Sequence, residues 1–353
     1  MRSRTLFALV ALVAGCGGLQ LTMVDSSYQE PSNVAVFFTV DTADGDPVAG
    51  LEATDFKIYE DGQLVSPDES QQTIINPEVA AEHYTLLIVD MSGSVTESDQ
   101  VGLIADSAQS FTAALEGVQK VAIYAFDGSE ELHPIQPFRA NSSGIGRLRG
   151  FRTRDPSTNL HGALLQSVEV LDEAIAQGEN PLRFGTIVVF TDGTDRASRV
   201  SFGEMDSALD NSGYDVFAIG VGNEIDEAVL DDIGHSGYVL IDDSAAIAAA
   251  FEAISERILG FTKRFYLLSY CSPARAGMHE VTIEAVVGEN SGSLDYTFDA
   301  TDFGPNCNPS RPPPFDMSGR NVNIRGPARG RIEVRVEPSA RSSASAEAEV
   351  EVD

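Results

Sequence analysis

The hydrophobic pattern of this chain changes twice, from β-type alternation to a mixed centre and back to β-type alternation. In the centre, an apolar run from Leu86 to Val89 stops abruptly at polar residues. A short apolar run with polar boundaries is typical of a buried strand, most often in a parallel sheet. Similar apolar runs at 186–190 and 215–221 predict two further buried strands in the same sheet.

Segments with helical periodicity separate these strands. Apolar residues recur three or four positions apart in three segments, residues 99–115, 160–176 and 244–258. Ser244 is the expected N-cap of the last of these helices. Shorter strands are expected at residues 121–126 and 238–241. This alternation of strands and helices predicts a doubly wound, mostly parallel α/β sheet over residues 81–260.

Both flanks of this region carry short β-type segments. The strands expected before it are residues 33–40, 47–51 and 56–60, and those expected after it are 264–270, 279–287 and 293–298, with a turn at 290–292. Each flank alone has too few strands for a core. We therefore expect one β-sandwich built from residues 32–78 and 263–304, with the α/β domain inserted between them. Two separate small β-domains are the alternative.

An acidic cluster lies in the first flank, at Asp41, Asp44 and Asp46. Asp44-Gly45 is a hairpin-turn signal, so a tight turn is expected here. The cluster lacks the twelve-residue spacing and the terminal Glu of an EF-hand loop, which disfavours a Ca²⁺ site.

The first fifteen residues have the pattern of a signal peptide. Arg2 and Arg4 precede an apolar run, and small residues then lead to Cys16. The segment Val13-Ala14-Gly15-Cys16 resembles the bacterial lipoprotein box, which implies lipidation of Cys16 and a lipid anchor in the cell envelope. Residues 16–31 are then expected to be a polar tether, and Gly17 favours the outer membrane. A plain secretory peptide with an incidental cysteine is the alternative.

Export predicts a disulfide between the two remaining cysteines, Cys271 and Cys307. An oxidising compartment favours pairing, and these are the only cysteines besides Cys16. Closing a loop of this length would stabilise the fold by about 3–4 kcal/mol. Two separate free thiols are the alternative.

Composition narrows the class of partner. The formal net charge is −31, from 54 acidic and 23 basic residues, which argues against nucleic-acid binding. The acidity fits either simple solubility or an environment rich in divalent cations.

Hydrophobic residues make up 42% of the chain, which is enough to form hydrophobic cores. Residues 305–353 are expected to be a Pro/Ser-rich linker followed by an acidic, β-like tail.

Polar residues with oxygen ligands follow the predicted central strands. Asp90, Ser92 and Ser94 come directly after the apolar run, at the edge of the sheet where open α/β folds bind ligands. This Asp-x-Ser-x-Ser pattern resembles the metal-ion-dependent adhesion site of von Willebrand factor type A (VWA) domains. Thr158, just before a helix, resembles that family's threonine ligand. Asp192, at the end of a second apolar strand, resembles its second aspartate.

The resemblance implies a cation site with one open position. Mg²⁺ prefers six oxygen ligands, and Mn²⁺ or Ca²⁺ are alternatives of similar preference. Neutral hydroxyls leave the cation's charge incompletely balanced, so it attracts an acidic side chain from a protein or peptide partner. If instead Ser and Asp merely cap the helices that follow each strand, no cation is needed.

Enzyme functions are not favoured. The sequence has no Gly-x-Ser-x-Gly elbow, no P-loop and no zinc-spaced His-Cys cluster. His161 lies close to Thr158 in sequence and is the one histidine placed to border the site. The sequence thus predicts an exported, lipid-anchored protein that binds acidic partners through Mg²⁺. A structural component of the envelope with an inactive site is the alternative, and a metal-dependent hydrolase is the weaker one.

Overall fold

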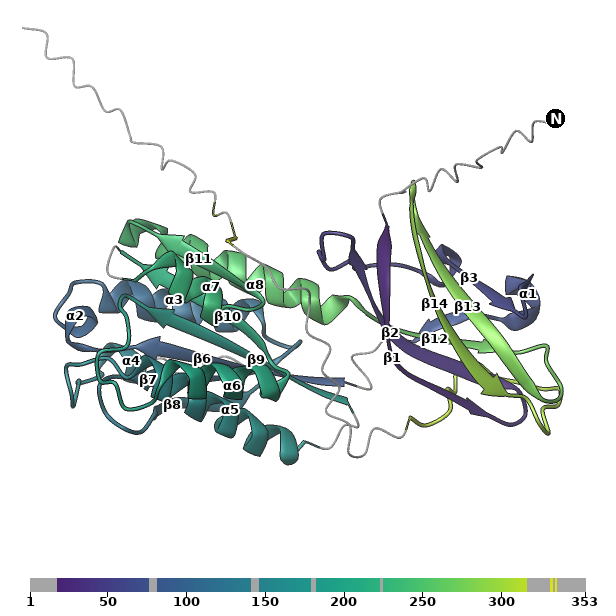
Figure 1. Cartoon of the computed structure of the whole chain (residues 1–353), viewed down its shortest axis with the longest axis horizontal. Coiled ribbons are helices and arrows are strands. Elements are labelled where there is room, and N and C mark those ends of the chain that lie inside the picture. The colour runs from purple at the N-terminus through teal and green to yellow at the C-terminus, as the bar shows by residue number, and fades with distance from the viewer. Residues whose placement is uncertain are drawn as a thin grey trace, which may run out of the picture.

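The computed structural model describes residues 18–75, 81–140, 146–178, 182–222, 225–315, 331, 332 and 334. The described chain forms an α/β domain and a β-sandwich that lie side by side (Figure 1). The predicted signal peptide, residues 1–15, and the lipidation candidate Cys16 lie outside the described residues. Within the described part of the chain, no helix has the length and apolar character needed to cross a bilayer.

Six strands form the sheet of the α/β domain, in the order β11-β10-β9-β6-β7-β8. Their bounds are β6 (Ala81–Asp90), β7 (Lys120–Phe126), β8 (His133–Arg139), β9 (Leu182–Thr191), β10 (Asp215–Val221) and β11 (Gly237–Ile241). All neighbouring pairs are parallel except β7 and β8, which are antiparallel. This confirms the predicted α/β fold with a mostly parallel sheet, to which β8 adds an edge strand that the apolar pattern did not reveal.

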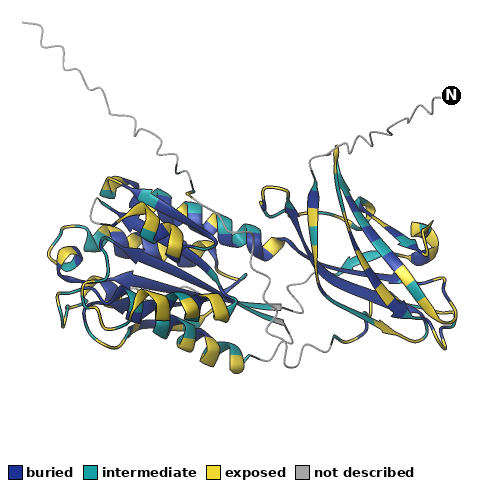
Figure 2. Ribbon diagram, viewed as in Figure 1, coloured by how far each residue is buried: buried dark blue, intermediate teal, exposed yellow. Residues whose placement is uncertain are grey.

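Helices cover both faces of this sheet, and only their outward sides are exposed (Figure 2). The helices are α2 (Gly93–Thr96), α3 (Val101–Ala114), α4 (Gly146–Arg149), α5 (Leu160–Ala176), α6 (Phe202–Ser212), α7 (Glu227–Ile233), the 3-10 turn η3 (Ser244–Ala246) and α8 (Ile247–Lys263). Alternate side chains of β6 enter different cores, because successive strand residues point to opposite faces. Leu87 and Val89 pack with α3 and α8, whereas Leu86 and Ile88 pack with α5, α6 and α7.

The expected cap of the last helix, Ser244, is wrong: α8 begins at Ile247, and its N-cap residue Ala246 makes no side-chain cap bond. The Asp243 side chain accepts the backbone N–H of Ala245 and caps η3, which leads directly into α8. Ser244 lies inside the 3-10 turn instead. A carboxylate and a hydroxyl stand side by side here, and either can cap a helix, so the sequence did not decide between them.

The two flanks form one sandwich, as predicted. One sheet has the order β1-β2-β12-β5 and the other β14-β13-β3-β4, so both sheets combine strands from before and after the α/β domain. The strands are β1 (Leu19–Gln29), β2 (Asn33–Thr42), β3 (Phe56–Glu60), β4 (Gln63–Leu64), β5 (Thr73–Ile75), β12 (Phe265–Cys271), β13 (Met278–Val287) and β14 (Asn290–Asp299). Two short helical turns, η1 (Ala53–Asp55) and α1 (Pro67–Ser70), connect strands of the first flank.

The predicted tether is wrong over residues 19–29, which form β1. This strand pairs with β2 along its whole length, and the register shifts between Met23 and Asp25. Leu19 faces the sandwich core before the shift, and Val24 faces the opposite side of the sheet. The irregularity interrupts the alternation of apolar residues, so the strand looked like a polar segment without a period.

Two smaller predictions in the sandwich also change, and a third holds. Residues 47–51 form no strand, because only Pro47 makes an isolated bridge, to Asp41. The hairpin between β13 and β14 turns at Gly288 and Glu289, before the predicted residues 290–292, and Gly288 supplies the positive φ that the turn needs. The acidic cluster is a turn, as expected, with the Gly45 N–H donating to the Thr42 carbonyl.

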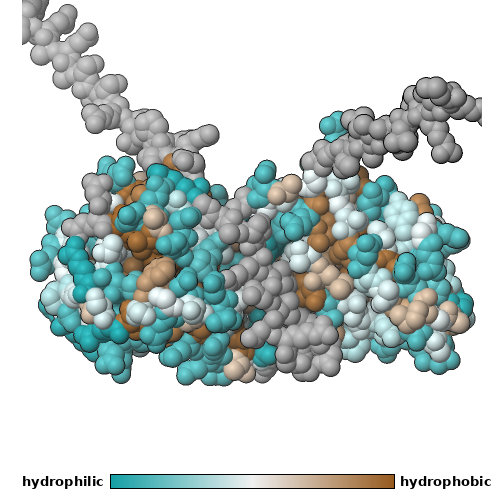
Figure 3. All heavy atoms as spheres, viewed as in Figure 1, coloured by the Kyte–Doolittle hydropathy of each residue, from teal (hydrophilic) through white to brown (hydrophobic). Residues whose placement is uncertain are grey.

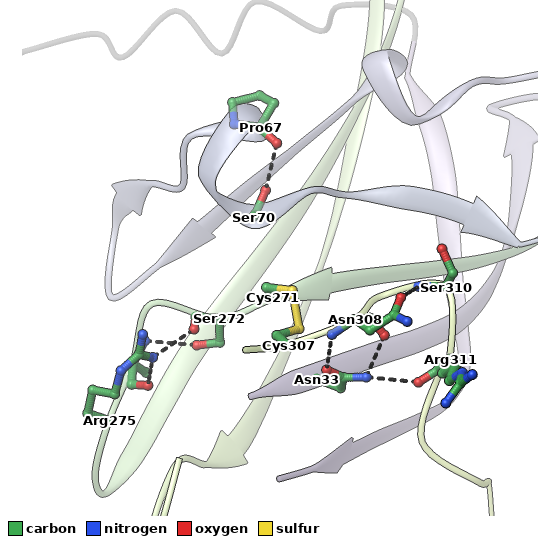
Figure 4. Close-up of a disulfide and its surroundings, with 11 residues drawn as sticks. Asn33, Pro67, Ser70, Cys271, Ser272, Arg275, Cys307, Asn308, Ser310 and Arg311 are labelled. Atoms are coloured by element: carbon green, nitrogen blue, oxygen red, sulfur yellow. Dashed lines mark hydrogen bonds between the residues drawn. A yellow bond between two sulfur atoms is a disulfide. The ribbon is translucent and has the colours of Figure 1, made fainter. Parts of the chain in front are cut away.

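The start of the predicted linker is packed against the sandwich instead. The disulfide between Cys271 and Cys307 forms as predicted and ties residues 305–315, here called the strap, to the end of β12 (Figure 4). The Asn33 side chain donates to the carbonyls of Asn308 and Arg311, each at 2.8 Å. The Pro-rich composition therefore indicated a segment without helix or strand, but it did not show that this segment packs against the sandwich. Most of the predicted tail, residues 316–353, lies outside the described residues.

The sandwich contacts the α/β domain at the amino-terminal ends of the central strands. Phe184 of β9 and Phe265 of β12 have ring centroids 4.6 Å apart, and His83 of β6 lies 5.1 Å from Phe184. A buried ion pair joins Arg264 to Asp41 at 3.1 Å. The carboxyl ends of β6 and β9 point away from this interface, so α2 lies at the end of the molecule remote from the sandwich (Figure 1).

Candidate metal centre

Asp90 ends β6 and anchors the loop that follows it. Its side chain is fully buried. One carboxylate oxygen accepts the backbone N–H of Ser92 at 2.9 Å, and the other accepts the hydroxyl of Thr191 at 2.8 Å. Because Thr191 ends the neighbouring strand β9, this second bond joins the two strand ends that carry the predicted ligands.

Two hydroxyls and a second carboxylate lie next to Asp90. The hydroxyl oxygens of Ser92 and Ser94 are 3.2 Å apart, and Ser94 donates to a carboxylate oxygen of Asp192 at 3.1 Å. Ser92 is buried, whereas Ser94 is exposed and Asp192 half-buried. Four of the five predicted ligands therefore form a connected group that is closed on the protein side and open toward solvent.

The two carboxylates destabilise each other's charge. Burial, followed by the nearby charge of Asp192, raises the pKa of Asp90 to about 7, despite the hydrogen bonds that favour its ionised form. A divalent cation beside both carboxylates would offset this repulsion. Within the described residues, no group of three or more His, Cys, Asp and Glu is placed to hold a metal ion. The oxygens that meet here belong to two carboxylates and two hydroxyls, and Mg²⁺ accepts such ligands together with water.

Thr158 lies on a loop that packs between the segment after β6 and the segment after β9. The Gly93 N–H donates to the Pro156 carbonyl at 3.0 Å, and a Cβ at Gly93 would meet Pro156 at 3.0 Å, so the loop is tightly packed against the start of α2. The Thr158 carbonyl accepts the backbone N–H groups of Arg196 and Ala197, both at 2.9 Å. Thr158 is therefore buried at the junction of all three predicted segments.

Asp127 holds this loop and was not predicted as a site residue. Its buried carboxylate accepts the backbone N–H groups of Ser129 at 2.8 Å and Arg154 at 2.7 Å, and it contacts His133 at 3.2 Å. Its own carbonyl accepts the Asn159 N–H. Asp127 directly follows the apolar strand β7, as Asp192 follows β9. This position could have identified Asp127 as a site residue from the sequence alone.

His161 has a positioning role beside the site. Its backbone N–H donates to Asp195 at 3.1 Å, and its ring nitrogen Nδ1 lies 3.1 Å from the Val200 carbonyl. The ring also stands edge-on to Phe202. These contacts fix the loop that follows Asp192, so the structure gives His161 a part in shaping the rim of the site.

Residues 85–194 match the family model described as "von Willebrand factor type A domain". The match covers about a third of the chain and includes all five predicted ligand positions. Together with the observed sheet, it confirms a VWA-like α/β fold. A search of curated proteins found no match.

Several solved structures resemble the chain at low identity. Proximal thread matrix protein 1 from the mussel byssus is 14% identical over 50% of this chain and 48% of its own, with a TM-score of 0.42. A von Willebrand factor type A protein from Catenulispora acidiphila is 11% identical over 80% and 74%, with a TM-score of 0.43. The manganese-loaded TRAP protein of Plasmodium vivax is 12% identical over 66% and 98%, with a TM-score of 0.42.

The chain spans about half the length of the mussel protein that it matches.

Proposed function

We propose that this protein binds an acidic group of a protein or peptide partner through a divalent cation. The cation is Mg²⁺, with Mn²⁺ or Ca²⁺ as alternatives, and it lies at the carboxyl ends of β6 and β9. Asp90, Ser92, Ser94, Thr158 and Asp192 would hold the cation, directly or through water. The cation supplies a positive charge that a partner carboxylate can approach from solvent. The chain's residues would position the cation, and the buried Asp90 and Ser92 close the side of the site that faces the protein.

The observation that carries this proposal is the connected group of oxygens around Asp90. Two carboxylates and two hydroxyls lie within hydrogen-bonding distance of one another or of a shared neighbour. Helix capping alone does not account for them, because the Ser92 side chain makes no cap hydrogen bond to α2. The exposed side of Ser94 leaves room for a ligand from outside.

Cation binding is tested by thermal unfolding with increasing Mg²⁺ or Mn²⁺. A ligand at 100 times its dissociation constant stabilises the folded state by about 2.7 kcal/mol, so Tm should rise by several degrees. Ser94→Ala and Asp192→Asn should lose most of this shift, because both residues lie at the open side of the site. They are safer variants than Asp90→Ala, which also removes the buried bond to Thr191.

Asp232→Asn is a matched control, because it neutralises an exposed carboxylate on α7. It should retain the full shift. Equal shifts in Ser94→Ala, Asp192→Asn and the control would show that the cation binds elsewhere. Partner capture that ignores a chelator would instead favour a structural role with an inactive site.

We also propose that the protein is exported and lipid-anchored through Cys16, most simply in the outer membrane. The support is the sequence Val13-Ala14-Gly15-Cys16 after the apolar run. A Cys16→Ser variant should leave the membrane fraction and fail to incorporate a labelled fatty acid, because the anchoring thiol is gone. The anchor would be contradicted if Cys16→Ser stayed in the membrane fraction and the parent incorporated no labelled fatty acid.

A further inference from the structure

A pocket of about 790 Å³ lies in the sandwich. Its walls are the end of β3, the short strand β4, the α1 turn, the loop after β12 and the first residues of the strap. The disulfide and the loop that carries Ser272 and Arg275 belong to one wall (Figure 4). β12 begins with Phe265 at the domain interface and ends with Cys271 at the pocket, so the pocket lies about 20 Å from that interface. It is therefore separate from the candidate metal centre.

Glu60 occupies a position in this pocket where the strand pattern calls for a hydrophobic residue. Phe56, Ile58 and Glu60 alternate along β3 and are all buried, so Glu60 is on the side of the strand that packs into the sandwich core. Its side chain is only 6% exposed. A buried carboxylate is costly unless partners compensate its charge. A buried glutamate that lines a pocket is thus a candidate binding residue.

The protein compensates the Glu60 carboxylate only in part. The Ser272 hydroxyl donates to Oε2 at 3.0 Å. The other oxygen, Oε1, is buried and has no hydrogen-bond partner among the described residues. Burial raises the pKa of Glu60, although the hydroxyls of Ser272 and Tyr270 favour its charged form. The Tyr270 hydroxyl is also engaged with Tyr296, at 3.3 Å. The charged carboxylate therefore lacks a full counter-charge.

The basic side chains that line the pocket bind other groups. The Arg275 guanidinium donates to two backbone carbonyls of its own loop, at 3.0 and 2.6 Å. The His279 ring contacts the Asp61 carboxylate at 2.7 Å and the Ala276 carbonyl at 3.0 Å. Within the described residues, neither side chain forms an ion pair with Glu60. A positive group from outside the chain could take that place.

The lining restricts the chemistry of such a ligand. Glu60, Asp61 and Glu69 supply three carboxylates against one guanidinium, which disfavours an anion. The described residues that line the pocket include no Phe, Tyr or Trp, so the aromatic cage that suits a quaternary ammonium is missing. The acidic side chains described here are not grouped to hold a metal ion. A primary ammonium fits, because it can both donate to Oε1 and neutralise the carboxylate.

We propose that this pocket binds a primary ammonium group, from a lysine side chain of a peptide or from a small free amine, with Glu60 as its counter-charge. The ammonium would donate to the buried oxygen that lacks a partner. The site needs no divalent cation, so it does not depend on the function proposed for the candidate metal centre.

Three probes test the proposal on the full chain. They are a glycyl-lysyl-glycine tripeptide blocked at both ends, the same tripeptide acetylated on its lysine Nζ, and diaminobutane. Binding is measured by NMR titration at about pH 8, where amines are protonated and carboxylates ionised. A chelator is present throughout, so that the candidate metal centre does not contribute. The parent should bind the lysine tripeptide and should not bind its acetylated form.

Glu60→Gln keeps the shape of the side chain and removes its charge. The variant should bind the lysine tripeptide about tenfold more weakly, because a charge-assisted hydrogen bond is lost. Its Tm without ligand should equal or exceed that of the parent, because an incompletely compensated buried charge is gone. A glutamate with a merely structural role would instead lower Tm when replaced. Glu289→Gln is the charge-matched control, because it neutralises an exposed carboxylate at the β13–β14 turn, and it should behave as the parent does.

Gln63→Arg tests the pocket without changing Glu60. Gln63 is exposed and lines the pocket, so the added positive charge should weaken lysine binding about threefold. Equal binding of the two tripeptides, or no binding of either amine by the parent, would overturn the proposal. So would unchanged binding in Glu60→Gln, or in Gln63→Arg if the first variant does not fold. Binding of diaminobutane without binding of the lysine tripeptide would support the site and identify a free amine as its ligand.

Discussion

Asp127 shows how one buried carboxylate can organise a site without being a ligand. Burial by itself would raise its pKa, but hydrogen bonds from Ser129 and Arg154 and the contact with His133 lower the pKa to about 2. The carboxylate is thus stabilised in its charged form. It holds the loop that carries Thr158 in place before any cation binds.

Replacing Asp127 by Asn should cost about 1–3 kcal/mol, because the amide NH₂ cannot accept the N–H bonds that the second carboxylate oxygen accepts. The Mg²⁺-dependent rise in Tm should also shrink, since Thr158 loses its support. Urea unfolding with and without Mg²⁺ measures both effects. An Asp127→Asn protein with parental stability and a full Mg²⁺ response would refute this role.

The pH dependence of the Asp127 contribution follows from the direction of its shift. Its folded-state pKa lies below the ordinary value of 3.8. The stabilisation is therefore present above about pH 4 and is lost as the pH falls toward about 2. The stability difference between the parent and Asp127→Asn should narrow over the same range.

Among the elements, the strap beside β12 depends most on a single covalent bond. The disulfide joins the last residue of β12 to Cys307, 36 positions later, and Asn33 of β2 fastens the residues that follow. The Ser27 hydroxyl also donates to the Pro314 carbonyl at 2.7 Å. The strap thereby covers one end of a sheet whose outer strand, β1, is irregular.

Removing the disulfide by Cys271→Ser/Cys307→Ser should destabilise the sandwich by about 3–4 kcal/mol, the loop-closure value for this separation. Chemical unfolding with and without a reductant measures this. The parent should lose stability in reductant, and the double variant should not respond. A parent insensitive to complete reduction would show that noncovalent contacts alone hold the strap.

In the whole molecule, the sandwich and the α/β domain share an aromatic interface. Phe37 stacks on Phe265 at 5.6 Å, and Phe265 in turn meets Phe184 and His83. Arg264 lies over the rings of Phe261 and Phe265 while it pairs with Asp41. Hydrophilic residues predominate on much of the visible surface of the α/β domain (Figure 3). The two domains are thus joined through buried residues at the end opposite the candidate metal site.

His83 makes this interface sensitive to acid. Burial, followed by the charge of Arg264, lowers the pKa of His83 to about 4. Between pH 6.5 and 4 the unfolded chain binds a proton that the folded protein does not, so stability falls as the pH falls. The loss attributable to His83 is at most about 3 kcal/mol.

A His83→Leu variant should therefore lose less stability than the parent between pH 7 and pH 4, as measured by urea unfolding at each pH. His235→Gln, which changes a half-buried histidine outside the interface, is the control and should keep the parental slope. Parallel pH curves for the parent and His83→Leu would exclude His83 as the titrating group.

The sequence by itself determined the elements whose patterns are local. Apolar runs and helical periodicity predicted β6, β9, β10, α3 and α5, because burial on both sides of a strand or on one side of a helix is written in consecutive residues. The Asp-x-Ser-x-Ser pattern likewise placed oxygen-bearing side chains at the end of β6, where the structure brings them together. The number of cysteines and the predicted export together predicted the disulfide.

Only the tertiary structure decided what depends on partners distant in the chain. β1 is a strand because β2 supplies its hydrogen bonds, although a register shift hides its alternation. Asp127 supports the site because its neighbours come from a loop some thirty positions later. Arg331, far from β11 in the sequence, lies beside that strand through a parallel bridge to Tyr238. Such pairings are set by packing between segments, which no local pattern records.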